Sequence, residues 1–236
     1  MKRHIYKELL NWKSNSDRKP LLLQGARQVG KTYIVKEFGK NEYSNFYHFN
    51  FEKNPVLKTF FSKNLNPETI LDSLSLFIGK KIDSKNTLIF FDGIQVSPEA
   101  ITSLKYFCEE APEYHIISAG SLLGVSVGKK SSFPVGKVNF MTLYPMCFTE
   151  YLTAFGDELL SEKINSMESL EPLHEALHNK LIGQLKMFLY LGGMPEVLQS
   201  FLKDKDIAKV RKIQNRILEA YKRDFSKYAD QEQNCK

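Results

Sequence analysis

The chain has 236 residues, is 42% hydrophobic and 25% charged, and carries a formal net charge of +6. This length suits one domain of ordinary size with a smaller appendage, and the composition is typical of globular proteins. The positive charge makes nucleic acid a conceivable partner, but the basic residues are scattered rather than gathered in a stripe.

Three widely spaced cysteines without a C-x-x-C pair argue against a disulfide framework or a cysteine metal cluster. The first residues do not form a signal-peptide pattern, and no apolar run approaches the roughly 20 residues of a membrane span. These features predict a cytoplasmic protein that does not enter a membrane.

In chain order, the hydrophobic pattern predicts an N-terminal amphipathic helix and then strands that alternate with helices. Alternation of this kind predicts a parallel sheet with helices on both faces, an α/β fold. Helical periodicity alone continues after about residue 148, which predicts a domain of residues 1–150 and a helical region of residues 151–236. The predicted strands are residues 21–23, 45–51, 87–92, 114–119 and 138–143, and the main predicted helices are residues 33–38, 67–80, 98 onward, 172–191, 196–203 and 207–228.

The segment between the first strand and the next helix has the pattern G-x-x-x-x-G-K-[ST], which is a phosphate-binding loop. Its glycines let backbone N–H groups point at phosphate oxygens, and the following helix adds the positive end of its dipole. Lys31 is expected to reach the β- and γ-phosphates, and the Thr32 hydroxyl to ligate Mg²⁺. The loop consists of Gly25, Ala26, Arg27, Gln28, Val29, Gly30, Lys31 and Thr32, and predicts ATP and Mg²⁺ as cofactors.

The strand over residues 87–92 ends in Asp92 after four apolar residues, the pattern of a Walker B carboxylate that holds Mg²⁺. In ATPases with an additional strand between the two motifs, a glutamate follows this aspartate and activates the attacking water. Gly93 stands at that position here and has no group that accepts a proton. Glu52, at the end of the second predicted strand, is a conceivable substitute, although an acid at a strand end is usually just solvated.

Several segments together resemble the AAA-type P-loop ATPases of bacteria and archaea that carry a C-terminal nuclease-like domain of unknown function. The resemblance covers nearly the whole chain and lies in residues 19–32, 50–52, 91–95, 120–124, 133–136, 143–146, 192–196 and 221–225. It implies a sheet with strand order 5-1-4-3-2 and a helical lid. It also implies that Ser121 is a sensor of the γ-phosphate and that residues 193–195 are a lid motif near the nucleotide. Both segments are also compatible with purely local roles, a turn cap and a helix break.

Relatives of this kind continue well beyond the point where this sequence stops, so the chain is expected to be a truncated or naturally short form. Asp92 and Ser121 are the candidates for a catalytic role. The leading interpretation is an ATP-binding switch with impaired hydrolysis, because Gly93 replaces the glutamate. The alternatives are an active ATPase that positions water with another group, and a nucleic-acid-associated module or degenerate fragment. Self-association is conceivable as well.

Overall fold

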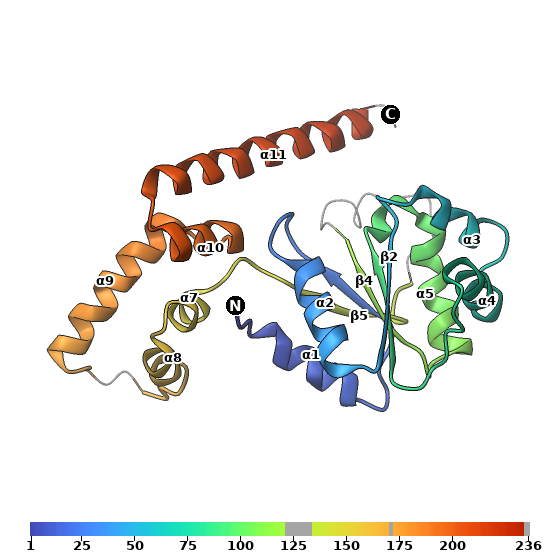
Figure 1. Cartoon of the computed structure of the whole chain (residues 1–236), viewed down its shortest axis with the longest axis horizontal. Helices are drawn as coiled ribbons and strands as arrows, with labels where there is room; N and C mark the ends of the chain where they lie inside the picture. Colours follow the sequence, from blue (N-terminus) through green and yellow to red (C-terminus); the bar gives the residue numbers. More distant parts are fainter. Residues whose placement is uncertain (121–133, 170–171, 234–236) are drawn as a thin grey trace. The chain divides into compact units, whose positions relative to one another are not determined.

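The computed structural model describes residues 1–120, 134–169 and 172–233, and side chains up to Phe225. Its residues divide into two compact units. One comprises Tyr6–Ala26 and Gly30–Leu143, and the other comprises Met1–Ile5, Arg27–Val29 and Tyr144–Lys236. We call them the sheet unit and the helical unit (Figure 1).

The sheet unit contains a parallel sheet that is five-stranded within the described residues, with strand order β2-β3-β4-β1-β5. This is the predicted order read from the opposite edge. The strands are β1 (Leu21–Gln24), β2 (Asn45–Asn50), β3 (Thr87–Asp92), β4 (His115–Ala119) and β5 (Asn139–Thr142). Strand β3, which lies between β2 and β4, is buried along its whole length, as expected for a parallel strand covered on both faces.

Helices lie on both faces of this sheet (Figure 1). The first face is covered by α1 (Ile5–Ser14) and α2 (Lys31–Glu42). The second is covered by α3 (Thr59–Ser62), α4 (Pro67–Ile78) and α5 (Pro98–Glu110), with the 3₁₀ turns η1 (Pro55–Lys58) and η2 (Ile94–Val96) between them. Side chains of β1, β3, α4 and α5 form one continuous core there, which includes Leu22, Phe91, Leu74 and Phe107.

The start of α5 and the end of α2 differ in how well the sequence predicts them. α5 begins as predicted, because the Ser97 side chain accepts a hydrogen bond from Ala100 N and Pro98 occupies the first helical position. The helix predicted over residues 33–38 is too short, since α2 continues through Gly39 to Glu42. A Cβ atom on Gly39 would lie 2.2 Å from Cδ2 of Phe46, so this glycine allows the helix to pack closely on β2.

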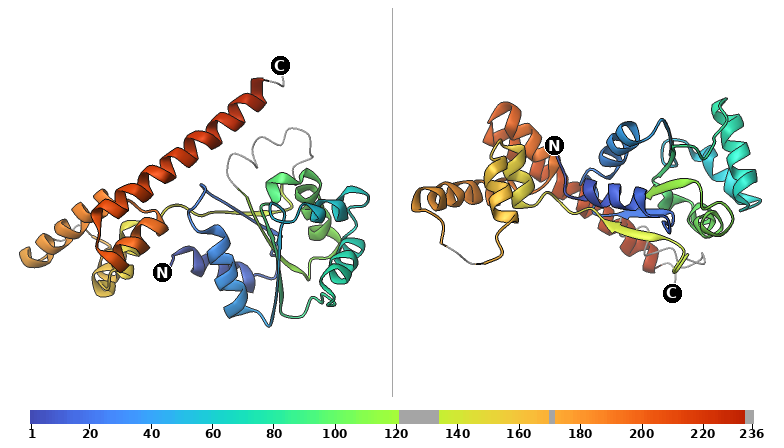
Figure 2. Two further views of the ribbon diagram at one scale, coloured as in Figure 1. Left: turned by 45° about the horizontal axis from the view of Figure 1, so that its top comes forward. Right: turned by 90° about the horizontal axis from the view of Figure 1, so that it is seen from below.

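The helical unit is built from α7 (Phe148–Ala154), α8 (Glu158–Asn165), α9 (Glu175–Leu191), α10 (Pro195–Asp204) and α11 (Ile207–Gln233), as Figure 2 also shows. Tyr151 is fully buried in its core, where its ring lies 4.2 Å from that of Phe155 and its hydroxyl donates to Gln184 Oε1 over 2.8 Å. α10 starts at Pro195, one residue before the helix predicted over residues 196–203, and the proline occupies its first helical position.

Candidate phosphate-loop site

The loop predicted to bind phosphate connects β1 to α2, in the strand–loop–helix order that the pattern requires. Gly30 is the N-cap of α2 and has a φ of 98°, a conformation that glycine adopts easily. Gln28 has a φ of 66°, which is uncommon outside glycine. Lys31 Nζ donates to Gly25 O and Ala26 O, over 2.8 Å each, so its ammonium group lies along the backbone of its own loop.

The carboxylate of Asp92 is the centre of a polar cluster beside this loop. Thr32 Oγ1 lies 3.1 Å from both carboxylate oxygens, so the two predicted Mg²⁺ ligands are direct neighbours. Asn50 Nδ2 donates to Asp92 Oδ2 over 3.0 Å, and His48 Nε2 lies 3.1 Å from the same oxygen. Asp92 is only 7% exposed, so these contacts largely replace its hydration.

Opposing effects set the charge of Asp92. Burial alone would raise its pKa, but hydrogen bonds from His48, Thr32 and Asn50 and the charge of His48 outweigh burial and hold the pKa below its ordinary value. A carboxylate with a lowered pKa is ionised at neutral pH, which is the form that ligates a divalent cation.

His48 and Asn50 contact the Asp92 carboxylate although no motif in the sequence marks either as a site residue. In the parallel register of β2 and β3, Asn50 pairs with Asp92 and His48 pairs with Phe90. Residues two apart on a strand face the same side, so both side chains reach the carboxylate. Their alternation was visible in the sequence, but the neighbouring strand and its register were not.

Gly93 directly follows Asp92 and has a φ of 71° in the left-handed region. Its N–H donates to Ala119 O over 2.9 Å. A Cβ atom at this position would lie 2.9 Å from Cγ of Glu52, so the Glu52 side chain passes through the space beside Gly93. The carboxylate of Glu52 is held there by Gln95, whose Nε2 donates to Glu52 Oε1 over 2.7 Å.

The family resemblance also pointed to Ser121 and to residues 193–195. Ser121 is outside the residues that the structure describes. Gly193, in the segment compared with a lid motif, lies in the helical unit, where its carbonyl accepts a hydrogen bond from Met146 N over 2.7 Å. Across the described ranges, the helices are all too short or too polar to serve as a bilayer-spanning segment.

Two family models match separate parts of the chain. A family model described as an AAA domain matches residues 17–152. A second model, described as a domain of unknown function, matches residues 182–235. No curated protein matches this sequence.

Among solved structures, the fold is similar to that of the Walker-type ATPase PABY2304 of Pyrococcus abyssi. The TM-score is 0.50 at 13% identity, and the match covers 97% of this chain and 74% of that one. AMPPCP-bound DnaA from Aquifex aeolicus has a TM-score of 0.43 at 16% identity, and the match covers 84% of this chain and 58% of that one. Drosophila ORC bound to DNA has a TM-score of 0.45 at 15% identity, and the match covers 78% of this chain and 54% of that one. At these identities the likeness concerns the fold alone.

Proposed function

We propose that this chain, which belongs to the AAA domain family, binds ATP together with Mg²⁺ at the loop of residues 25–32 and at Asp92. The observation that carries the proposal is the pairing of Thr32 with Asp92, 3.1 Å apart at the start of α2 and the end of β3. A hydroxyl and an ionised carboxylate are hard oxygen ligands of the kind that Mg²⁺ prefers.

The residues present fit such a ligand. The backbone N–H groups at the start of α2 and the Lys31 ammonium group are the donors for phosphate oxygens. Thr32 and Asp92 supply oxygens for the metal, which would neutralise phosphate charge when bound. Asn50 and His48 hold the Asp92 carboxylate in place from the neighbouring strand.

We further propose that hydrolysis is impaired and that the protein acts as a nucleotide-dependent switch. Residues 1–150 would be the ATP-binding domain and residues 151–236 the helical lid. The support is Gly93, which offers no side chain to orient or deprotonate a water molecule. Loss of such a base typically slows chemistry by about 10²–10⁴-fold and leaves binding largely intact.

A second candidate function, an active ATPase, is favoured by the position of Glu52. Its side chain runs beside Gly93 and its carboxylate is fixed by Gln95. In this alternative, Glu52, two residues after the end of β2, supplies the carboxylate that position 93 lacks.

The binding proposal is tested by titrating the protein with a fluorescent ATP analogue, with and without Mg²⁺. Lys31→Ala should abolish binding, because the ammonium group proposed to bind the phosphates is lost. Lys40→Ala removes an exposed lysine from the same helix and should bind as the wild type does. Equal affinities of all three proteins would refute the proposal.

Phosphate release under single-turnover conditions distinguishes impaired hydrolysis from an active ATPase that uses Glu52. Gly93→Glu and Gly93→Gln share the cost of a side chain at positive φ, so the difference between them isolates the carboxylate. If hydrolysis is impaired, Gly93→Glu should exceed both Gly93→Gln and the wild type by at least about tenfold. If Glu52 is the base, the wild type should already be active and Glu52→Gln should lower its rate about 10²-fold. A wild-type rate that equals that of a catalytically active Gly93→Glu variant refutes impaired hydrolysis.

A further inference from the structure

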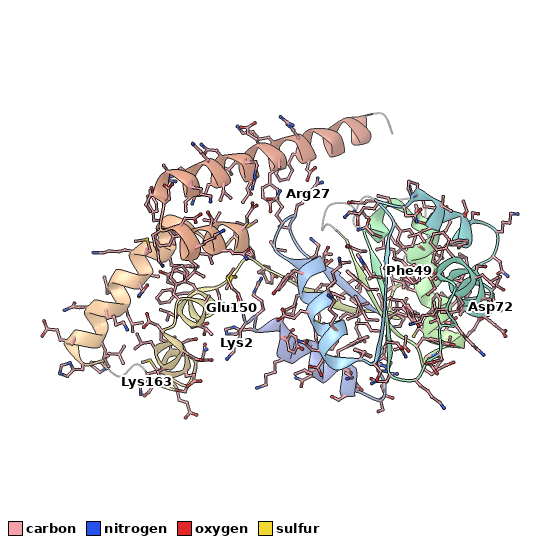
Figure 3. The ribbon with its side chains drawn as sticks, in the orientation of Figure 1. Lys2, Arg27, Phe49, Asp72, Glu150 and Lys163 are labelled. Carbon is pink, nitrogen blue, oxygen red and sulfur yellow. The ribbon has the colours of Figure 1, made fainter. Side chains whose placement is uncertain are left out.

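Three side chains with different ligand chemistry converge in the helical unit, outside the phosphate-loop site. They are His4, Cys147 and Glu150. His4 lies just before α1, Cys147 is the N-cap of α7, and Glu150, which is labelled in Figure 3, lies in the first turn of α7. A ring nitrogen, the thiol sulfur and a carboxylate oxygen of these residues all lie within 4.8 Å of one another. His4 and Cys147 are exposed, whereas Glu150 is buried.

Glu150 fixes the backbone of both other residues. Its Oε1 accepts a hydrogen bond from His4 N over 2.7 Å, and its Oε2 accepts one from Cys147 N over 3.1 Å. The carboxylate therefore brings two segments that are 143 residues apart in sequence to one point. Each oxygen has two lone-pair directions, so Oε2 keeps one for a further ligand.

The charges determine which oxygen is available. Arg3 Nε lies 3.1 Å from Oε1, and both side chains are less than 10% exposed, so a cation at Oε1 would meet a buried guanidinium group. Oε2 lies on the side of Cys147, whose sulfur is 3.8 Å from His4 Nδ1 and 3.3 Å from Thr149 Oγ1. The Thr149 hydroxyl can donate to a thiolate at that position.

The donor set indicates the metal. Imidazole, thiolate and carboxylate together suit Zn²⁺, whereas Mg²⁺ and Ca²⁺ take oxygen ligands. Zn–S and Zn–N bonds of about 2.3 and 2.0–2.1 Å place two tetrahedral ligands roughly 3.5 Å apart. The observed 3.8 Å between Cys147 Sγ and His4 Nδ1 is within a small side-chain adjustment of this separation.

We propose that His4, Cys147 and Glu150 form a zinc-binding site, with Nδ1, Sγ and Oε2 as ligands and water in the fourth, solvent-facing position. Binding converts the Cys147 thiol to a thiolate and releases one proton to solvent. The site would join the N-terminal residues to the start of α7. It involves none of the proposed nucleotide ligands.

Co²⁺ is the probe, because a cobalt–thiolate bond gives a charge-transfer absorption band in the near ultraviolet. The tag-free protein, freed of metal by a chelator and kept reduced with a phosphine, is titrated with Co²⁺. We expect a band that saturates at one Co²⁺ per chain and is lost when one equivalent of Zn²⁺ is added. A band from the phosphate-loop site is not expected, since Thr32 and Asp92 carry no sulfur.

The variants separate this site from the other thiols. Cys147→Ser should abolish the band, and His4→Gln should weaken Co²⁺ binding at least about tenfold. Cys108→Ser and Cys235→Ser should leave the titration unchanged. Because Glu150 also caps α7, both informative variants keep that residue intact. No thiolate band in the wild type, a band that survives Cys147→Ser, or unaltered affinity in His4→Gln would overturn the proposal.

Discussion

Gly193→Ala is expected to destabilise the helical unit strongly, because the new methyl group has no room. A Cβ atom on Gly193 would lie 2.2 Å from Met146 O, which is 1.2 Å less than the 3.4 Å at which ordinary contact begins. The obstacle is backbone, with Met146 N and C also 3.0 and 3.1 Å away. No flexible side chain can therefore move aside, and the two segments must separate.

The expected cost has two parts. Forcing a methyl group into a filled space costs about 1–3 kcal/mol. Separation also weakens the hydrogen bond from Met146 N to Gly193 O, 2.7 Å long, whose net contribution is about 0.5–1.5 kcal/mol. Together these amount to about 1.5–4.5 kcal/mol, or a fall in Tm of roughly 3–18 °C for a protein of this size.

The assay is thermal unfolding followed by far-ultraviolet circular dichroism, with Gly183→Ala as the matched control. Gly183 lies in α9, is exposed and has nothing within 4 Å of its would-be Cβ. Alanine there should stabilise the helix by about 0.5–1 kcal/mol. Trp12, the single tryptophan, is buried in the sheet unit and reports that unit separately by fluorescence. A Tm for Gly193→Ala equal to that of the wild type would refute the steric argument.

Two further predictions concern the sheet unit. Gly39→Ala should destabilise the sheet unit by about 1–3 kcal/mol, because the methyl group would overlap the Phe46 ring at 2.2 Å. Urea unfolding followed by Trp12 fluorescence measures this loss of stability, and an unchanged unfolding midpoint would contradict the prediction. The lowered pKa of Asp92 means that its contribution to stability is present above the unfolded-state value of about 3.8 and is lost as pH falls through the folded-state pKa. His48→Ala removes one of the contacts that lower this pKa, so the stability of this variant should fall less than that of the wild type between neutral and acidic pH. An equal fall of the urea midpoint in both proteins over that pH range would count against the argument.

The parts of the fold that local patterns determine were predictable from the sequence. The apolar runs of β1, β3 and β4 and the cap at Ser97 each depend on neighbouring residues, and the structure confirms them. The strand order followed from the family resemblance, not from periodicity. The match of the AAA domain over residues 17–152 is consistent with that resemblance.

What the sequence did not reveal depends on contacts between distant segments. Gly39 has the sequence environment of a helix end, but α2 continues to Glu42, and the close approach of Phe46 explains why a glycine stands inside the helix. His48 contributes to the Asp92 cluster because β2 pairs with β3 in one particular register. Cys147 is isolated in sequence from the other cysteines, and only folding brings it to His4.

Contacts between distant segments also matter at Gly93, the residue that leads to the prediction of weak hydrolysis. The motif identifies a missing carboxylate at one position along the chain, but chemistry requires a carboxylate at one position in space. Glu52 passes within 2.9 Å of the Cβ that Gly93 lacks and is fixed by Gln95 at its end. The space that a side chain at position 93 would enter is therefore already occupied by an acidic side chain from the turn after β2. A Gly93→Glu variant would accordingly place two carboxylates side by side, where like charges raise at least one pKa. Its gain in activity over Gly93→Gln should then be larger in a Glu52→Gln background, if Gly93 is the cause of slow hydrolysis. The opposite result, a gain that disappears in that background, would mean that the two carboxylates act together.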